Sequence, residues 1–173
     1  MQALAYWKAV TRDHADFLGE FLSILVENGI RYCVIGGQGV NAYAYPLISL
    51  DLDVAVITED INRVEALLSE RFHVERFEHS INASAGGSEL RVQIQTDPRY
   101  AAFVSRATPR DVLGVTLQVA AVEDVLQGKL WAFLDETRRR SKRQKDLADI
   151  GRLIDAYPNL RDRIPREVLD RMV

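Results

Sequence analysis

A short apolar run that ends at two adjacent glycines is the feature that most constrains the fold. Tyr32–Ile35 consists of strand-forming residues, and Gly36 and Gly37 follow it directly. The segment from Gln38 to Pro46 then carries apolar residues at helical spacing before the proline ends it. We therefore expect a strand, a tight glycine turn and a short helix, a unit of proteins whose helices pack on a sheet.

The rest of the sequence extends this alternation of helices and strands. An amphipathic helix over Asp13–Asn28 is expected before the first strand, because its apolar residues recur at helical spacing. The segment Ser80–Gly87 is polar, contains two glycines and is predicted to be a turn. Further strands are expected over Leu50–Ile57, His73–His79, Glu89–Thr96 and Val112–Val119, and further helices are expected to begin at Thr58 and at Pro98.

Composition fits one globular unit. Of the 173 residues, 47% are hydrophobic and 27% are charged, which is average for soluble proteins and excludes disordered and fibrous architectures. Everything after Val119 is predicted to be helical. We expect an α/β (α+β) fold, a mixed sheet flanked by helices, with an α/β core over residues 1–120 and a C-terminal helical portion over residues 121–173 packed on it.

The cysteine and histidine content excludes two kinds of structural site. Cys33 is the only cysteine, so no internal disulfide can form, and the three histidines lie too far apart in sequence to make a zinc cluster with it. No run approaches the roughly 18 consecutive apolar residues that a transmembrane helix needs. We therefore expect a cytoplasmic protein without membrane contact.

Gly36 and Gly37 are the first candidate binding residues. The exposed backbone N–H groups at a helix start attract phosphate, and glycine lets a phosphate come close. A glycine pair is also common in ordinary turns, so this motif alone does not decide between a phosphate site and a plain turn.

Asp51 and Asp53 indicate chemistry more sharply. Residues two apart in a strand point to the same face, so both carboxylates stand side by side at the start of the predicted strand. Aspartate is depleted in strands, and two such charges repel, so the pair requires a cation, and its oxygen atoms suit Mg²⁺ or Mn²⁺. The alternative is an exposed strand edge on which the aspartates are merely solvated.

Lys129 lies within the apolar stripe of the predicted helix Val122–Asp135 rather than opposite it. Lysine is almost never fully buried without a partner. Two interpretations stay open. Either the stem packs along the core and the amine reaches solvent, or the amine faces a polar cleft and neutralises carboxylates or phosphates.

The charges are unevenly distributed along the chain. The net charge of −3 conceals a block, residues 138–145, that carries six positive charges and no negative one. Outside the block, 16 of the 22 basic residues remain against all 25 acidic ones. Such a block marks either a solvated face or a site for phosphate.

A capping-box pattern divides this basic block. Ser141 and Gln144 have the spacing of a capping box, which predicts that a helix begins there and that the arginines before it end the preceding helix. Lys142 and Arg143 would then oppose the dipole of the new helix. A bound anion such as a nucleoside triphosphate or an RNA backbone, or the nearby Asp146, would compensate.

The order and spacing of these motifs resemble a known superfamily. The run VIGGQ at Val34, followed by DLDV at Asp51, resembles the glycine pair and acid-x-acid strand of the DNA polymerase β-like nucleotidyltransferases. The stretches VLQGKLWAFLD and SKRQKDLADIGRLI are similar to the lysine and K-D-x-x-D motifs of its abortive-infection branch, the AbiEii/AbiGii-type toxins of type IV toxin–antitoxin systems. The resemblance spans about residues 20–157.

The resemblance implies a metal-dependent transfer of a nucleoside monophosphate from an NTP to an acceptor hydroxyl. Mg²⁺ or Mn²⁺ would be the cofactor, RNA such as tRNA or a protein the acceptor, and a cognate antitoxin a partner. The implied metal ligands are Asp51 and Asp53. The residues implied to hold the triphosphate or to order the site are Gly36, Gly37, Gln38, Ser49, Lys129, Arg143, Lys145 and Asp146.

The sequence departs from the superfamily pattern at two positions. Active members usually place a third acid on a neighbouring strand, where this chain has Gln93, which can offer a metal only a neutral oxygen. Glu89 lies on the same face, but four residues along a strand is roughly 13 Å. Leu47 stands where many relatives carry a basic residue, whereas Ser49 fits the pattern.

Two functions of different classes follow from these observations. The leading hypothesis is a nucleotidyltransferase that uses NTP and Mg²⁺ and acts as a toxin. The alternative, favoured by Gln93, is a degenerate nucleotidyltransferase fold that binds nucleotide or RNA without turnover, or serves as an interaction module. A third interpretation takes the acid pair and the basic block as solvated surface only.

Overall fold

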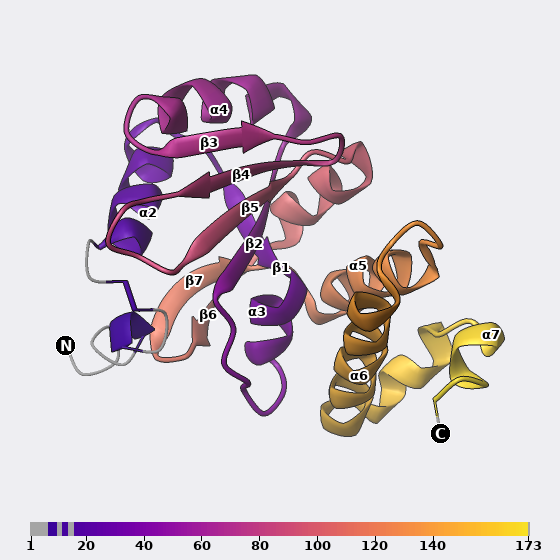
Figure 1. The fold of residues 1–173 in the computed structure, drawn as a ribbon. Helices are drawn as coiled ribbons and strands as arrows, with labels where there is room; N and C mark the ends of the chain where they lie inside the picture. Colours follow the sequence, from indigo (N-terminus) through magenta and orange to yellow (C-terminus); the bar gives the residue numbers. More distant parts are fainter. Residues whose placement is uncertain (1–6, 10–11, 14–15, 173) are drawn as a thin grey trace.

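A computed structural model describes residues 7–9, 12–13 and 16–172. Its centre is a seven-stranded mixed sheet with the strand order β3-β4-β5-β2-β1-β7-β6 (Figure 1). The pairs β2–β5 and β1–β7 are parallel and the others are antiparallel. The strands are β1 Tyr32–Ile35, β2 Asp51–Val56, β3 His73–Arg76, β4 Ser80–Ser84, β5 Arg91–Gln95, β6 Thr108–Val112 and β7 Val115–Val119.

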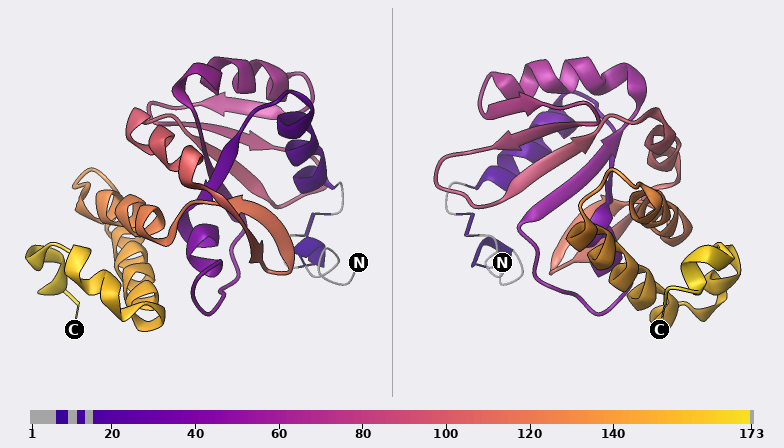
Figure 2. Two further views of the ribbon diagram at one scale, coloured as in Figure 1. Left: turned by 180° about the vertical axis from the view of Figure 1, so that it is seen from behind. Right: turned by 45° about the vertical axis from the view of Figure 1, so that its right-hand side comes forward.

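Helices cover the sheet on both faces, which confirms the expected fold class. One core joins α2 and α4 to the sheet, and a second core joins the other face to η2, α5 and α6. Figure 2 shows α5, α6 and α7 grouped together, apart from α2 and α4. The helices are α2 Phe17–Glu27, α3 Gly36–Asn41, η1 Thr58–Asp60, α4 Ile61–Ser69, η2 Pro98–Arg106, α5 Val122–Leu134, α6 Arg140–Ala156, η3 Pro158–Arg163 and α7 Arg166–Leu169.

The first predicted helix begins later than its sequence pattern suggests. Part of the predicted range, residues 14–15, lies outside the described residues. Asp16 has a left-handed backbone with φ 57°, so α2 begins after it. The buried carboxylate of Asp13 accepts the backbone N–H groups of Phe17 and Leu18, at 2.7 and 2.9 Å, which satisfies two donors of the first turn.

The segment predicted as a polar turn contains a strand. Residues 80–84 form β4, which pairs with β3 on one side and β5 on the other. Ile81 and Ala83 are buried in the core that contains α2 and α4, whereas Ser80, Asn82 and Ser84 lie half-buried on the opposite face of the sheet. The turn prediction was wrong because the second face of β4 is only partly covered, so a strand can carry serine and asparagine there.

The predicted strand over Val112–Val119 is a hairpin. The chain turns after Val112 because Leu113 and Gly114 both have positive φ, and the residues on either side form β6 and β7. Two short strands therefore replace one longer strand, and β6 forms an edge of the sheet.

A new helix does begin within two residues of Ser141, but the predicted capping box does not form. Helix α6 begins at Arg140, and no side chain caps its first turn. Helix α5 already ends at Leu134, and Asp135 accepts hydrogen bonds from the backbone N–H and the hydroxyl of Thr137, which closes a turn between the two helices. Arg139 and Arg140 therefore lie at the start of α6, and Arg138 lies in the turn before it, rather than at the end of α5.

No helix in the described part of the chain is long and apolar enough to cross a membrane.

Candidate active site

The antiparallel pairing of β1 and β2 brings the glycine turn to the acid pair. Ile35, the last residue of β1, pairs with Asp53 on β2. The chain then turns through Gly36, whose φ is +64°, and a Cβ at that position would lie only 2.3 Å from Asp53 Oδ2. Glycine is therefore required here by both backbone conformation and close approach.

Asp51 and Asp53 point to the same face of β2, whereas Leu52 and Val54 are buried on the other. Asp51 Oδ1 lies 2.8 Å from the Nε of Arg91 on β5. Its backbone N–H donates to Ser49 Oγ at 3.2 Å. The first aspartate is thus held by a neighbouring strand and by the loop before β2.

Asp53 is the electrostatically strained member of the pair. Burial raises the pKa of its carboxyl to about 6, opposed most strongly by the positive charge of Lys129 and then increased by the negative charge of Asp51. Within the described part of the chain, no group donates a hydrogen bond to the carboxylate of Asp53 or forms an ion pair with it. Its carboxylate oxygens are therefore available to a cation in the pocket.

Lys129 takes the second of the two roles left open by the sequence. Its amine is buried and lies 3.0 Å from Asp146 Oδ1 and 2.8 Å from Asp149 Oδ2, both on α6. Burial acts to lower the pKa of this amine, but the charges of Asp149 and Asp146 outweigh burial and the pKa is raised. Arg138 adds a second cation, with Nε 2.7 Å from Asp146 Oδ2.

A further chain of hydrogen bonds connects this cluster to the loop before β2. Arg152 forms an ion pair with Asp149 at 2.9 Å, donates to Asn41 Oδ1 at 3.0 Å and also donates to the backbone carbonyl of Tyr45. Asn41 in turn donates to the carbonyl of Leu47 at 2.7 Å. Helix α6 therefore fixes the loop that carries Ser49.

Arg152 and Asn41 were missed by the sequence analysis, and Asp149, the second acid of the K-D-x-x-D motif, was given no role there. Asp146, Asp149 and Arg152 follow one another at intervals of three residues, which places them on one face of a helix. That spacing could have identified Asp146, Asp149 and Arg152 as one charged cluster. The part played by Asn41 depends on the path of a loop and has no comparable sequence signal.

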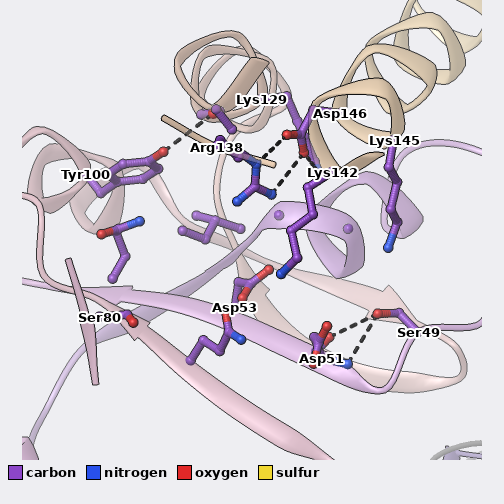
Figure 3. Close-up of a pocket in the computed structure, with 17 residues that line it drawn as sticks. Ser49, Asp51, Asp53, Ser80, Tyr100, Lys129, Arg138, Lys142, Lys145 and Asp146 are labelled. Atoms are coloured by element: carbon purple, nitrogen blue, oxygen red, sulfur yellow. Dashed lines mark hydrogen bonds and ion pairs between the residues drawn. The ribbon is translucent and has the colours of Figure 1, made fainter. Parts of the chain in front are cut away.

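Most of the predicted site residues converge on one pocket, shown in Figure 3. Arg138 and Lys142 also line it, and the figure shows the side chains of Lys142 and Lys145 directed from α6 toward the strand that carries the acid pair. The predicted residues that line this pocket are Gly36, Gly37, Ser49, Asp51, Asp53, Gln93, Lys129, Lys145 and Asp146.

Two predicted residues lie outside the lining of this pocket. Gln38 is fully buried, donates to the carbonyl of Ser49 at 3.1 Å and accepts from Asn41 at 2.8 Å. It therefore stabilises the loop before β2 from inside the protein. Arg143 donates through Nε to the carbonyl of Phe133 at 2.7 Å and lies over its ring, which ties α6 to α5.

The strand register places Gln93 directly beside Asp53. The described residues contain no group of three or more His, Cys, Asp or Glu side chains that could hold a metal ion, so the acid pair has no third carboxylate. Two carboxylates and an amide oxygen still form an oxygen donor set of the kind that Mg²⁺ and Mn²⁺ prefer. The residues present therefore fit a divalent cation that completes its coordination with oxygens of a ligand.

A protein-family model matches most of this chain. The family model described as "Nucleotidyl transferase AbiEii toxin, Type IV TA system" matches residues 47–172, a range that contains the acid pair, Lys129 and α6. No curated protein shows a significant sequence match.

Two solved structures share the fold. The antibiotic-resistance factor ANT(2'')-Ia is 13% identical, with a TM-score of 0.54 over 89% of this chain and 93% of that chain. The lincosamide antibiotic adenylyltransferase LnuA, solved with lincomycin bound, is 12% identical, with a TM-score of 0.51 over 79% of this chain and 95% of that one. Identities this low show the common architecture alone.

The close approach at the glycine turn generates a stability prediction. Gly36→Ala is expected to lower the free energy of unfolding by about 1–3 kcal/mol, because alanine is strained at positive φ and its Cβ would displace Asp53. Gly37→Ala is the matched control. Its Cβ would meet nothing within 4 Å, so urea denaturation should show an unchanged value or a gain of up to about 1 kcal/mol. Equal losses in both variants would refute the close approach.

The raised pKa of Asp53 predicts how stability depends on pH. The carboxyl titrates near its ordinary value of 3.8 when unfolded and at about 6 when folded, so the folded state holds the proton more tightly and stability falls as pH rises from about 4 to about 6. Asp53→Asn removes this cost. In EDTA at pH 8 the variant should be more stable than the wild type by about 2–3 kcal/mol, with the difference vanishing near pH 4. Urea denaturation between pH 4 and pH 8 should show that the difference in free energy of unfolding between the two proteins grows with pH. A constant difference would contradict the raised pKa.

Proposed function

Since this chain belongs to the AbiEii nucleotidyltransferase toxin family, we propose that it transfers a nucleoside monophosphate from an NTP to an acceptor hydroxyl. The observation that carries the proposal is that the acid pair, the glycine turn and the cations of α6 all line one pocket. A triphosphate would supply negative charge to pair with the cations of this pocket. A divalent cation would supply positive charge to pair with the two carboxylates.

The chain's own residues would bind and orient the nucleotide. Lys142 and Lys145 would approach the phosphates as point charges, and the backbone at Gly36 and Gly37 would admit the phosphates closely. Asp51 and Asp53 would hold Mg²⁺ or Mn²⁺, which when bound shields the phosphate charge and aligns the α-phosphate with the acceptor. The acceptor hydroxyl would lose its proton to solvent as its oxygen forms a bond to the α-phosphorus. The bond between the α-phosphorus and the oxygen that bridges to the β-phosphate would break, and pyrophosphate would leave.

We further propose that the acceptor is RNA such as tRNA and that the protein acts in the cytoplasm as the toxin of a pair with a cognate antitoxin. The exposed side chains of Arg139 and Arg140 extend the positive charge of α6 beyond the pocket, which favours a polyanionic acceptor. A protein acceptor is the other outcome that the assay below would detect.

The alternative function is binding without turnover. Gln93 supports it, because the position beside Asp53 lacks the carboxylate that would help to hold a metal and to activate the acceptor hydroxyl. Binding of NTP without transfer under any condition would establish this second function.

Label transfer tests the proposal. The purified protein, Mg²⁺ and each α-³²P-labelled NTP are incubated with total RNA or cell extract, and the products are separated on denaturing gels. The wild type is expected to label RNA, whereas Asp53→Asn should reduce the label by at least about a hundredfold, because the metal loses a charged ligand. Asp155→Asn, an exposed aspartate on α6 outside the pocket lining, serves as the control and should retain wild-type transfer. Equal labelling by the wild type and Asp53→Asn would contradict the proposed chemistry.

A further inference from the structure

Arg138 lies in the turn between α5 and α6 and lines the pocket. Its backbone N–H donates to the carbonyl of Asp135 at 3.1 Å. Its guanidinium donates from Nε to Asp146 Oδ2 at 2.7 Å and from Nη2 to Asp146 Oδ1 at 3.4 Å. Both the backbone and the side chain of this arginine are therefore held in place.

The carboxylate that holds Arg138 is itself fixed. The side chain of Asp146 is 2% exposed, against 34% for that of Arg138. Asp146 also accepts a hydrogen bond from the buried amine of Lys129 at 3.0 Å. Since a buried carboxylate with two cationic donors cannot leave either of them without cost, Arg138 has a rigid support.

One nitrogen of the fixed guanidinium has no partner. Within the described part of the chain, no hydrogen bond or ion pair uses Nη1 of Arg138. Figure 3 shows the other two nitrogens on the side of Asp146 and the third directed away from it, toward the strand that carries Asp53. The N–H donors of Nη1 are therefore available to a ligand in the pocket.

Arg138 differs from the two lysines of the pocket in position. Figure 3 shows Arg138, Lys142 and Lys145 in this order along the pocket, from the side of Tyr100 to the side of Ser49. The positive charge of Arg138 also lowers the pKa of Asp53 more than the charge of Lys142 does. Arg138 therefore acts where Asp53 would hold the metal ion and the α-phosphate.

Arg138 also differs from these lysines in rigidity. Within the described part of the chain, neither Lys142 nor Lys145 forms a hydrogen bond or an ion pair through its amine, and a lysine amine sits on a flexible stem. During phosphoryl transfer, the transition state carries charge on the oxygens of the phosphate that is attacked. A donor that is already in position stabilises this charge without reorganising.

We propose that Arg138 is a catalytic residue that donates from Nη1 to a non-bridging oxygen of the α-phosphate and that this contact strengthens in the transition state. The proposal rests on the proposed function for the reaction and for the place of the α-phosphate. The guanidinium keeps its protons throughout. The acceptor oxygen bonds to the α-phosphorus and its proton passes to solvent, while the bridging oxygen leaves with pyrophosphate. Lys142 and Lys145 contribute to affinity, whereas Arg138 contributes to the rate.

Rate and affinity are measured separately to test this role. The rate of label transfer is determined at saturating NTP, and calorimetry gives the Kd of a non-hydrolysable α,β-methylene NTP with Mg²⁺. Arg138→Gln should lower the rate at least about a hundredfold, the effect of losing one preorganised donor, and change the Kd by no more than about fivefold. Arg138→Lys should still lose at least about tenfold in rate, because one amine cannot reproduce the fork of a guanidinium.

The ³¹P NMR spectrum of the bound analogue provides a second measurement that needs no turnover. Arg138→Gln should shift the resonance of the bound α-phosphorus relative to the wild type and leave that of the γ-phosphorus unchanged, because only the α-phosphate loses a contact. Urea denaturation checks that each variant is folded under the conditions of the assays.

Arg106→Gln is the matched control. Arg106 holds Asp124 in the same way, with Nε 2.7 Å from Oδ2 and Nη2 3.0 Å from Oδ1, but lies outside the pocket lining. This variant should keep wild-type transfer. Wild-type rates at saturation in Arg138→Gln, equal losses in Arg138→Gln and Arg106→Gln, or an unmoved α-phosphorus resonance would overturn the proposal. A wild type that binds the analogue but transfers no label would contradict the proposed function instead, and the α-phosphorus resonance would still decide whether Arg138 contacts the phosphate.

Discussion

The buried ion cluster of Lys129 with Asp146 and Asp149 is the interaction on which the rest of the site depends. It joins α5 to α6 through groups that are each less than a tenth exposed. Removing one partner of such a cluster would leave uncompensated buried charge, at a cost of about 3–5 kcal/mol. Arg152 forms an ion pair with Asp149 of this cluster and also donates a hydrogen bond to Asn41. One set of charges therefore orients both α6 and the loop before β2.

In the pocket next to this cluster, by contrast, charges of opposite sign are not paired with one another. Asp53 on the sheet and Lys142 and Lys145 on α6 all lie around one space, yet in the described part of the chain none of the three forms an ion pair. The backbone keeps the two signs of charge apart because they lie on separately anchored elements. Unpaired charges of this kind reduce stability, and proteins retain them where a ligand supplies the missing partner.

The sequence predicted the features that depend on local spacing. The glycine turn follows from two adjacent glycines after an apolar run, and the acid pair and the lysine in an apolar stripe follow from periods of two and about four residues. All of them line the pocket. Features that depend on the meeting of distant segments could not be predicted. The register that places Arg91 beside Asp51, and the loop path that brings Asn41 to Arg152, are set by tertiary packing. Strand β4 was missed for the same reason, since its polar residues are explained only by the partly covered face of the sheet on which they lie.

The central claim is that the acid pair and the cations of α6 are two halves of one nucleotide site. Calorimetric titration of a non-hydrolysable NTP with Mg²⁺ tests it most directly, comparing Lys142→Ala/Lys145→Ala with Arg139→Ala/Arg140→Ala. Both variants remove two exposed cations from the same block, but only the first pair lines the pocket. The account predicts that the lysine variant binds at least about tenfold more weakly than the wild type while the arginine variant stays within about threefold. Equal affinities of the wild type and the lysine variant would contradict it.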